Sequence, residues 1–257
     1  MSCSIVAVIN QKGGVGKTTT AVNLATALAA IGKSVLVLDL DPQGNSTTGF
    51  GAPKGKGINS SYGVLLGLVD ATSVVRETYI VGLHLIPSTI DLSAAEVELF
   101  SEKDRDSKLK KAISSLKYDY IFIDCPPGFG FININVLNAS NKIIIPLQCE
   151  FYALEGLAQL FNTIQGVKNT INRNLIVSGI VLTMYDRRNS LSSVVANDVR
   201  GHFNRLVFDT AIPRNVRISE ASSHGKPVII YDMKSSGAIA YIELAREFLA
   251  REKINDE

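Results

Sequence analysis

Ten residues near the N-terminus, Asn10–Thr19, constrain the fold of this chain more than any other feature. Their sequence, NQKGGVGKTT, follows a short apolar segment, Ile5–Ile9, and opens a longer patterned stretch, Thr18–Ala30. The first segment has the composition of a buried strand, and the second has the periodicity of a helix. A glycine-rich turn between a strand and a helix predicts a phosphate-binding loop, in which backbone N–H groups and the helix dipole face an anion.

Individual residues of this loop are suited to bind a nucleoside triphosphate. We expect Lys17 to contact the β- and γ-phosphates and the Thr18 hydroxyl to ligate Mg²⁺. The usual pattern, G-x-x-x-x-G-K-[ST], has a glycine where this chain has Gln11, and a second lysine, Lys12, precedes the glycines. Its position at the start of the loop makes Lys12 a poor candidate for a contact with the γ-phosphate of its own nucleotide.

Carboxylates follow two further strands. The predicted strand Ser34–Leu38 leads into Asp39 and Asp41, which alternation places on one face of the strand end. The predicted strand Tyr118–Ile123 leads into Asp124, a Walker B pattern. A carboxylate at the end of a buried apolar strand is costly unless it serves a cation or a partner, so we expect Asp124 to hold Mg²⁺ through a water.

The remaining pattern predicts a single α/β domain over residues 1–257. Further strands are expected at 83–86, 142–145 and 175–182, and further helices at 91–100, 107–116, 153–170, 190–203 and 238–251. Apolar strands separated by helices predict a P-loop NTPase fold, a mostly parallel twisted sheet with helices on both faces. No stretch is suited to be a linker, and we interpret 49–63 as a surface loop.

Composition narrows the class of protein. The net charge of +2 means that any nucleic-acid binding must come from a local basic patch. No apolar run approaches the roughly 20 residues of a membrane span, and no signal peptide is recognisable. The three cysteines have neither paired nor metal-ligand spacing, which favours a reducing cytosol. We therefore expect a cytoplasmic protein.

The loop with its early lysine resembles the deviant Walker A motif of the ParA/MinD family of ATPases. The segment Ile145–Leu157 resembles the chromosomal, Soj-like branch of ParA proteins, and the resemblance extends from Ile5 to about Phe248. It implies that the cofactors are ATP and Mg²⁺. It also implies that Lys12 reaches the phosphates of a partner subunit, so that ATP binding and homodimerisation are one event.

The resemblance also assigns site residues. The catalytic residues it implies are Lys12, Lys17 and Asp41, the last of which prepares the attacking water. The phosphate-binding residues are Lys12, Gly13, Gly14, Val15, Gly16, Lys17, Thr18 and Thr19, and the adenine pocket is formed by Met184, Pro213 and Arg214. The metal site consists of Thr18, Asp41 and Asp124. One departure from the family is Gly128-Phe129-Gly130, where its members more often have Ser-Leu-Gly.

The family members bind double-stranded DNA non-specifically in the dimeric ATP state, and the matching positions here are Arg188 and Arg217. The stretch 187–234 holds eight basic and four acidic residues, an excess of four that by itself is typical of a solvated face. The resemblance further implies that a ParB-type centromere-binding protein stimulates hydrolysis, and that the protein is associated with the nucleoid. Since only 11 residues precede Lys12, we expect no N-terminal helix-turn-helix domain and no autorepression through one.

Other functions share the same ATPase core. A MinD-like positioner should end in a basic amphipathic helix, but Glu243–Glu257 has five acidic and three basic residues, so we expect no stable membrane binding. An iron–sulfur ATPase is disfavoured because Cys125 and Cys149 lack the context of cluster ligands. A static nucleotide-binding scaffold and an ATPase that positions protein cargo remain as alternatives.

Overall fold

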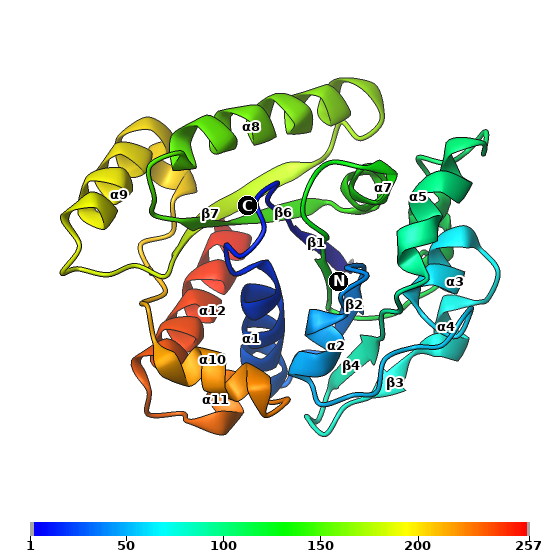
Figure 1. Cartoon of the computed structure of the whole chain (residues 1–257), viewed down its shortest axis with the longest axis horizontal. Coiled ribbons are helices and arrows are strands. Elements are labelled where there is room, and N and C mark those ends of the chain that lie inside the picture. Colours follow the sequence, from blue (N-terminus) through cyan, green and yellow to red (C-terminus); the bar gives the residue numbers. More distant parts are fainter. Residues whose placement is uncertain (1–2, 256–257) are drawn as a thin grey trace.

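Seven strands form one sheet through the middle of the structure, a computed structural model that describes residues 3–255 (Figure 1). The order is β3-β4-β2-β5-β1-β6-β7, and every neighbouring pair is parallel except β3 with β4. The strands are β1 Ser4–Val8, β2 Val35–Asp39, β3 Arg76–Glu77, β4 Leu83–Ile86, β5 Tyr120–Asp124, β6 Lys142–Gln148 and β7 Ile176–Thr183. The α/β class with a mostly parallel sheet is therefore confirmed.

Helices cover both faces of this sheet, so alternate residues of β5 belong to different apolar cores. Tyr120 and Phe122 pack with α1 and α12, whereas Ile121 and Ile123 pack with α7 and α8. The helices are α1 Lys17–Ala30, α2 Asn45–Gly49, α3 Ser61–Leu66, α4 Ala71–Val74, α5 Leu92–Phe100, α6 Lys108–Ala112, α7 Phe131–Ala139, α8 Ala153–Thr170, α9 Ser190–Phe203, α10 Val216–Ser223, α11 Val228–Tyr231 and α12 Ser236–Asn255, with a 3₁₀ turn, η1, at Asn204–Leu206.

The strand ends at the centre of the sheet bring the predicted motifs together. Strand β5 lies between β1 and β2, and Asp124 is aligned with Val8 on one side and with Asp39 on the other. Parallel strands end at the same edge of a sheet, which is where α/β proteins bind ligands. The loop after β1 and the carboxylates at the ends of β2 and β5 therefore share one edge.

Strand β6 is longer than predicted and contains Pro146. Its pairing with β1 stops at Ile144, whereas its pairing with β7 continues to Gln148. The Pro146 carbonyl accepts a hydrogen bond from Asn10, the second residue after β1, so the nitrogen of Pro146 also faces this side. Since no β1 residue pairs there, the missing N–H costs no ladder hydrogen bond.

Two helix predictions need correction. The helix expected over 107–116 ends at Ala112, and the Ser114 hydroxyl bonds instead to the carbonyl of Lys111 at 2.8 Å. Serine competes in this way with helical hydrogen bonding. Helix α7, with the sequence FININVLNA, was not predicted, because asparagine and isoleucine are weak helix formers. The short elements α2, α3, α4, α11 and β3 were also missed. The segment interpreted as a surface loop has no helix or strand over 50–60, but α3 begins at Ser61.

Helix α12 contains most of the acidic C-terminal stretch on which the expectation about membranes was based. The final two residues of that stretch, Asp256 and Glu257, lie outside the described residues. Between residues 3 and 255, no helix is both long and apolar enough to cross a membrane.

Candidate nucleotide-binding site

The loop between β1 and α1 has the geometry of an anion cradle. Gly14 and Gly16 have φ angles of 75° and 89°, in the left-handed region that glycine adopts without strain. A Cβ atom on Gly13 or Gly14 would meet nothing within 4 Å, so the surface of the loop is open. Helix α1 begins at Lys17 and directs its free N–H groups toward this opening.

Neighbouring strands hold the loop in this shape. The Thr183 hydroxyl, at the end of β7, donates to the carbonyl of Val15 at 2.8 Å. The Asn10 side chain accepts a hydrogen bond from the Lys12 amide at 3.0 Å and donates one to the Pro146 carbonyl at 2.8 Å. These contacts fix both ends of the loop to the sheet before any ligand is bound.

The two lysines of the loop lie in different surroundings. The Lys17 side chain is 6% exposed and donates to the carbonyl of Lys12 at 2.8 Å. Burial lowers the pKa of Lys17, while the charges of Asp124 and Asp41 act in the opposite direction. Lys12 is exposed, and its ammonium forms an ion pair with Glu150, which follows β6. The Lys12 side chain therefore faces away from the cradle that surrounds Lys17.

The three carboxylates differ in their access to this edge of the sheet. Asp39 is fully buried and accepts hydrogen bonds from the amide and the hydroxyl of Thr47, both at 2.7 Å. Asp41 is 7% exposed and accepts the amide of Gln43 at 2.9 Å. The two aspartates therefore have different surroundings. Asp39 is bonded to Thr47 of α2, whereas Asp41 faces the open side of the loop.

Asp124 has the features expected of a metal-binding carboxylate. It is fully buried, and its Oδ2 atom accepts the Ser46 hydroxyl at 2.8 Å. Its Oδ1 atom is buried and has no hydrogen-bond partner of normal geometry within residues 3–255. Burial raises the pKa of Asp124, and the hydroxyls of Thr18 and Ser46 and the charge of Lys17 act against it. A cation beside Thr18 would satisfy this orphaned oxygen, so the residues present fit Mg²⁺.

A cavity of about 770 Å³ lies over the loop and joins segments distant in sequence. Its walls include most of the predicted site: Gly13, Gly14, Gly16, Lys17, Thr18, Thr19, Asp41, Met184, Pro213 and Arg214. Met184 has a φ of 50°, which is rare for a residue with a side chain. Lys12, Val15 and Asp124 are not on the walls of this cavity. The opening thus reaches from the phosphate cradle to the residues expected around adenine.

Pro126 and Pro127, in the loop after β5, also line the cavity. Glu96 and Leu92 of α5 and Tyr241 of α12 line it as well, and these three were not predicted. The helices carrying these residues could be expected from periodicity, but which face of each turns toward the loop depends on packing. The sequence signal for them was limited to their helical pattern.

The two arginines expected to bind DNA lie outside this cavity, and both are paired with acids. The Arg188 side chain is 89% exposed and donates two hydrogen bonds to Asp186, each at 3.0 Å. Arg217 donates to Glu220 at 2.7 Å and lies 3.4 Å from Asp232.

A strand–loop–helix cradle with a lysine at the start of the helix is the nucleotide site of a P-loop NTPase, and the comparisons with known proteins agree. The family model of the AAA domain matches residues 3–177. The chromosome partitioning protein ParA of Caulobacter vibrioides is 49% identical over 253 residues, which are 97% of this chain and 95% of that protein. The sporulation initiation inhibitor protein Soj of Bacillus subtilis is 49% identical over 248 residues, covering 96% of this chain and 98% of that protein. The chain belongs to the ParA/Soj family of ATPases.

The structural comparison adds a ligand-bound relative. The cobyrinic acid a,c-diamide synthase of Mycobacterium smegmatis, solved with ADP and magnesium, has a TM-score of 0.86 and 37% sequence identity to this chain. The match covers 98% of this chain and 96% of that protein. The fold of the whole described chain is therefore that of a P-loop NTPase.

Proposed function

We propose that this protein is an ATP-dependent DNA-partitioning ATPase. The observation that carries the proposal is a cavity lined by the phosphate loop and Asp41, with the buried carboxylate of Asp124 close to Thr18 and Lys17 of that loop. Two further facts support it: relatives about half identical over nearly the whole chain are chromosome partitioning proteins, and a structural relative was solved with bound ADP and magnesium.

In this proposal the cavity binds ATP together with Mg²⁺. The backbone N–H groups of 13–19 and the Lys17 ammonium hold the phosphates, while Met184, Pro213 and Arg214 enclose the base. Thr18 and Asp124 hold the metal, with Asp41 supporting its water shell. The metal neutralises charge on the phosphate oxygens when it is bound.

Asp41 is the residue that we assign to the attacking water. It lines the cavity, and its hydrogen bond from the Gln43 amide fixes the direction of its carboxylate. Phosphoryl transfer depends mainly on positioning, so the loss of one such carboxylate is expected to slow hydrolysis while leaving ATP binding intact. Asp41→Ala should therefore hold the protein in the ATP-bound state.

Lys12 is assigned to the phosphates of a partner subunit in an ATP-bound homodimer. In the structure described here its ammonium is paired with Glu150, so dimerisation requires Lys12 to exchange this carboxylate for a phosphate. An exposed ion pair of this kind is worth about 0–1 kcal/mol, which a charge-assisted contact with a phosphate can replace.

The dimer presents two copies of Arg188 and Arg217 to the DNA backbone, so affinity is expected to rise with ATP. A ParB-type centromere-binding protein stimulates the slow hydrolysis, the dimer dissociates, and the released protein rebinds elsewhere on the nucleoid. The resulting gradient moves a chromosome or a plasmid within the cytoplasm.

The test is binding to random-sequence DNA at moderate salt, with ATP, with ADP and without nucleotide, using Asp41→Ala to maintain the ATP state. We expect strong binding with ATP alone, and its loss in Arg188→Ala and Arg217→Ala. Release of phosphate by the wild-type protein over hours distinguishes an ATPase from a static scaffold. Absence of DNA binding in every state would reject the partitioning function and favour an ATPase acting on membranes or protein cargo.

A further inference from the structure

Helix α7 receives its N-terminal cap from a distant helix. The Glu96 carboxylate, on α5, accepts hydrogen bonds from the amides of Phe131 at 2.7 Å and Ile132 at 3.2 Å. These are the first residues of α7, whose preceding residue, Gly130, supplies no side-chain cap. The first N–H groups of a helix have no partner within it, and a carboxylate there also interacts favourably with the helix dipole.

This cap ends the loop that connects Asp124 to α7. Pro126 and Pro127 of the loop line the nucleotide cavity, and so does Glu96 itself. At its middle, the loop is held by Gly128, whose amide donates to the carbonyl of Gln11 at 2.9 Å. Glu96 therefore fixes the far end of a segment that joins the proposed metal carboxylate, the cavity wall and the phosphate loop.

A second side chain, from α7, holds the loop between Asp124 and Gly130. Asn133 is 1% exposed, and its Nδ2 atom donates to the carbonyl of Gly128 at 2.8 Å and to that of Pro126 at 3.3 Å. Together with Glu96 it connects the loop to α7 and α5. The position of the loop thus depends on α5, a helix that contributes no residue to the phosphate cradle.

The position of Gly130 favours glycine because Glu96 lies close to it, and not because of its backbone conformation. Its φ and ψ are −96° and −171°, which residues with side chains adopt readily. A Cβ atom at this position, however, would lie 2.2 Å from Oε1 of Glu96. Since a contact this short cannot persist, any larger residue at 130 would displace the Glu96 carboxylate.

We propose that Glu96 is a positioning residue for ATP hydrolysis, which acts by fixing the loop from Asp124 to Gly130 at the wall of the nucleotide cavity. The proposal rests on the proposed ATPase function. Phosphate binding depends on the loop after β1, which Glu96 does not contact, whereas turnover depends on how well the opposite wall is placed. A displacement of about 1 Å at such a site can cost on the order of 100-fold in rate.

The test separates turnover from binding. We expect Glu96→Ala to lower kcat about 10-fold and to leave the dissociation constant for ATP within about two-fold of the wild-type value. The two amides bond to different oxygens of Glu96, so Glu96→Gln keeps one acceptor and places an NH2 group against the other amide, and it should recover only part of the rate. Glu98→Ala is the matched control, because Glu98 lies on the same helix but its carboxylate bonds to the Tyr62 hydroxyl, and it should leave kcat unchanged.

A second variant tests the same contact without altering Glu96. Gly130→Ala should lower kcat as Glu96→Ala does, and the double variant should be no slower than either single one, since both remove one interaction. Amide hydrogen exchange measured over 126–134 should accelerate in both single variants, with α1 unchanged. Thermal unfolding of each variant confirms that it is folded.

The outcomes distinguish this inference from the proposed function. If the wild-type protein hydrolyses no ATP, the proposed function is rejected and the role of Glu96 with it. If the wild-type protein hydrolyses ATP but Glu96→Ala turns over as fast as Glu98→Ala, only the inference is rejected. Additive losses in Gly130→Ala and Glu96→Ala would also reject it.

Discussion

At the scale of single residues, Lys12 and Lys17 show how far two identical side chains five positions apart can differ. Lys17 is buried at the base of the cavity and bonds to the carbonyl of Lys12, whereas Lys12 points outward to Glu150. A buried ammonium that donates to a backbone carbonyl and faces a cavity is well placed for an anion. An exposed one in an ion pair is available for exchange with another subunit.

Substitution of the two lysines should separate ATP binding from dimerisation. Lys17→Ala removes the only ammonium on the phosphate side of the cavity wall among residues 3–255, so we expect ATP binding to be lost in calorimetry. Lys12→Ala should retain ATP binding but lose the ATP-dependent dimer in sedimentation experiments. A Lys12→Ala protein that still dimerises with ATP would show that the trans-lysine assignment is wrong.

The ion pair between Lys12 and Glu150 should oppose dimerisation slightly. Glu150→Gln leaves the shape of this side chain and removes its charge, so the Lys12 ammonium is released. Because an exposed pair is worth about 0–1 kcal/mol and a dimer loses two of them, one in each subunit, we expect the ATP-bound dimer to form at a protein concentration up to about 30-fold lower. Sedimentation of wild type and variant with ATP measures the shift. A weaker dimer in the variant would mean that Glu150 contributes to the interface itself.

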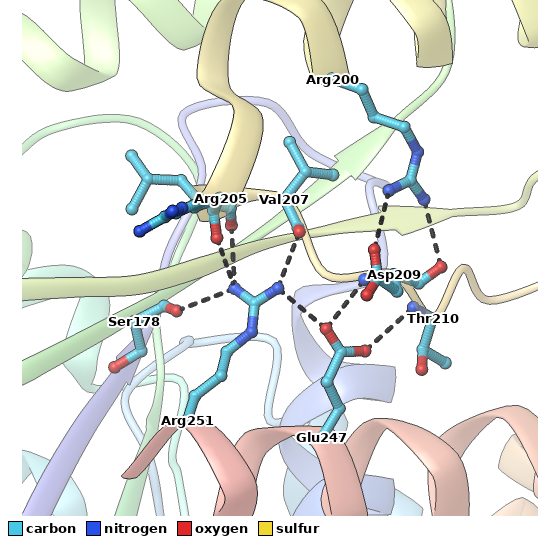
Figure 2. A network of polar contacts seen from close by, with 9 residues as sticks. Ser178, Arg200, Arg205, Val207, Asp209, Thr210, Glu247 and Arg251 are labelled. Carbon is cyan, nitrogen blue, oxygen red and sulfur yellow. Dashed lines mark hydrogen bonds and ion pairs between the residues drawn. The ribbon is translucent and has the colours of Figure 1, made fainter. Parts of the chain in front are cut away.

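At the scale of helices and strands, one polar network attaches the end of α12 to the segment after α9 (Figure 2). The Arg251 guanidinium donates to the carbonyls of Val207 at 2.7 Å and Arg205 at 3.0 Å, and lies 4.1 Å from the centre of the Phe208 ring. Glu247 accepts Nη2 of Arg251 at 2.8 Å. A planar cation with several fixed donors is needed here, which lysine cannot replace.

The carboxylate of this network predicts a pH dependence of stability. Burial raises the pKa of Glu247, but hydrogen bonds from the amides of Thr210 and Asp209 and the charge of Arg251 outweigh it, so the pKa lies below its ordinary value of 4.5. A lowered carboxyl pKa stabilises the folded state above the unfolded pKa, and the contribution is lost as pH falls through the folded pKa. Glu247→Gln should therefore be less stable than wild type in urea at pH 7, with a difference that shrinks below about pH 4.

Arg251→Lys should destabilise the same network. The carbonyls of Ser178, Arg205 and Val207 would lose donors that a single ammonium cannot supply together, and we expect a loss of about 2 kcal/mol in the free energy of unfolding. Arg246→Lys is the control, because the Arg246 side chain, in the same helix, makes no hydrogen bond or ion pair within residues 3–255. Equal stability of both variants in urea would contradict the stated role of Arg251.

The sequence predicted those elements whose signals are local. The strand, glycine turn and helix around Lys17 form one continuous segment, and the apolar strands before Asp39 and Asp124 are recognisable without their neighbours. Helix α7 could not be found in this way, because its asparagines are stabilised by distant contacts, such as that of Asn135 with the carbonyl of Arg105, and its cap comes from Glu96. The part of the cavity near Pro213 followed from family resemblance, since only the folded sheet brings it beside the loop.

At the scale of the whole molecule, the small net charge of +2 conceals how the arginines are arranged. Arg188 is paired with Asp186, and Arg217 with Glu220 and Asp232, so the monomer presents these cations already partly neutralised. A DNA phosphate must compete with these acids at each arginine. Weak contacts of this kind give substantial affinity only when several engage at once, which is what a dimer provides.

The salt dependence of DNA binding should therefore reveal how many subunits are bound. Each phosphate contact contributes about 0.9 to the slope of log K against log salt concentration. If the ATP-bound state is a dimer with Arg188 of both subunits on DNA, Arg188→Ala should lower the slope by about 1.8, whereas a monomer would lose about 0.9. Arg173→Ala serves as the control for a general loss of charge and should leave the slope unchanged, because Arg173 precedes β7 whereas Arg188 follows the other end of that strand. Titrations of Asp41→Ala with random-sequence DNA and ATP between 50 and 200 mM salt, a range of about four-fold, are sufficient to distinguish these slopes. A slope unaffected by Arg188→Ala would remove this arginine from the DNA interface, and a loss of about 0.9 would mean that DNA engages only one subunit of the pair.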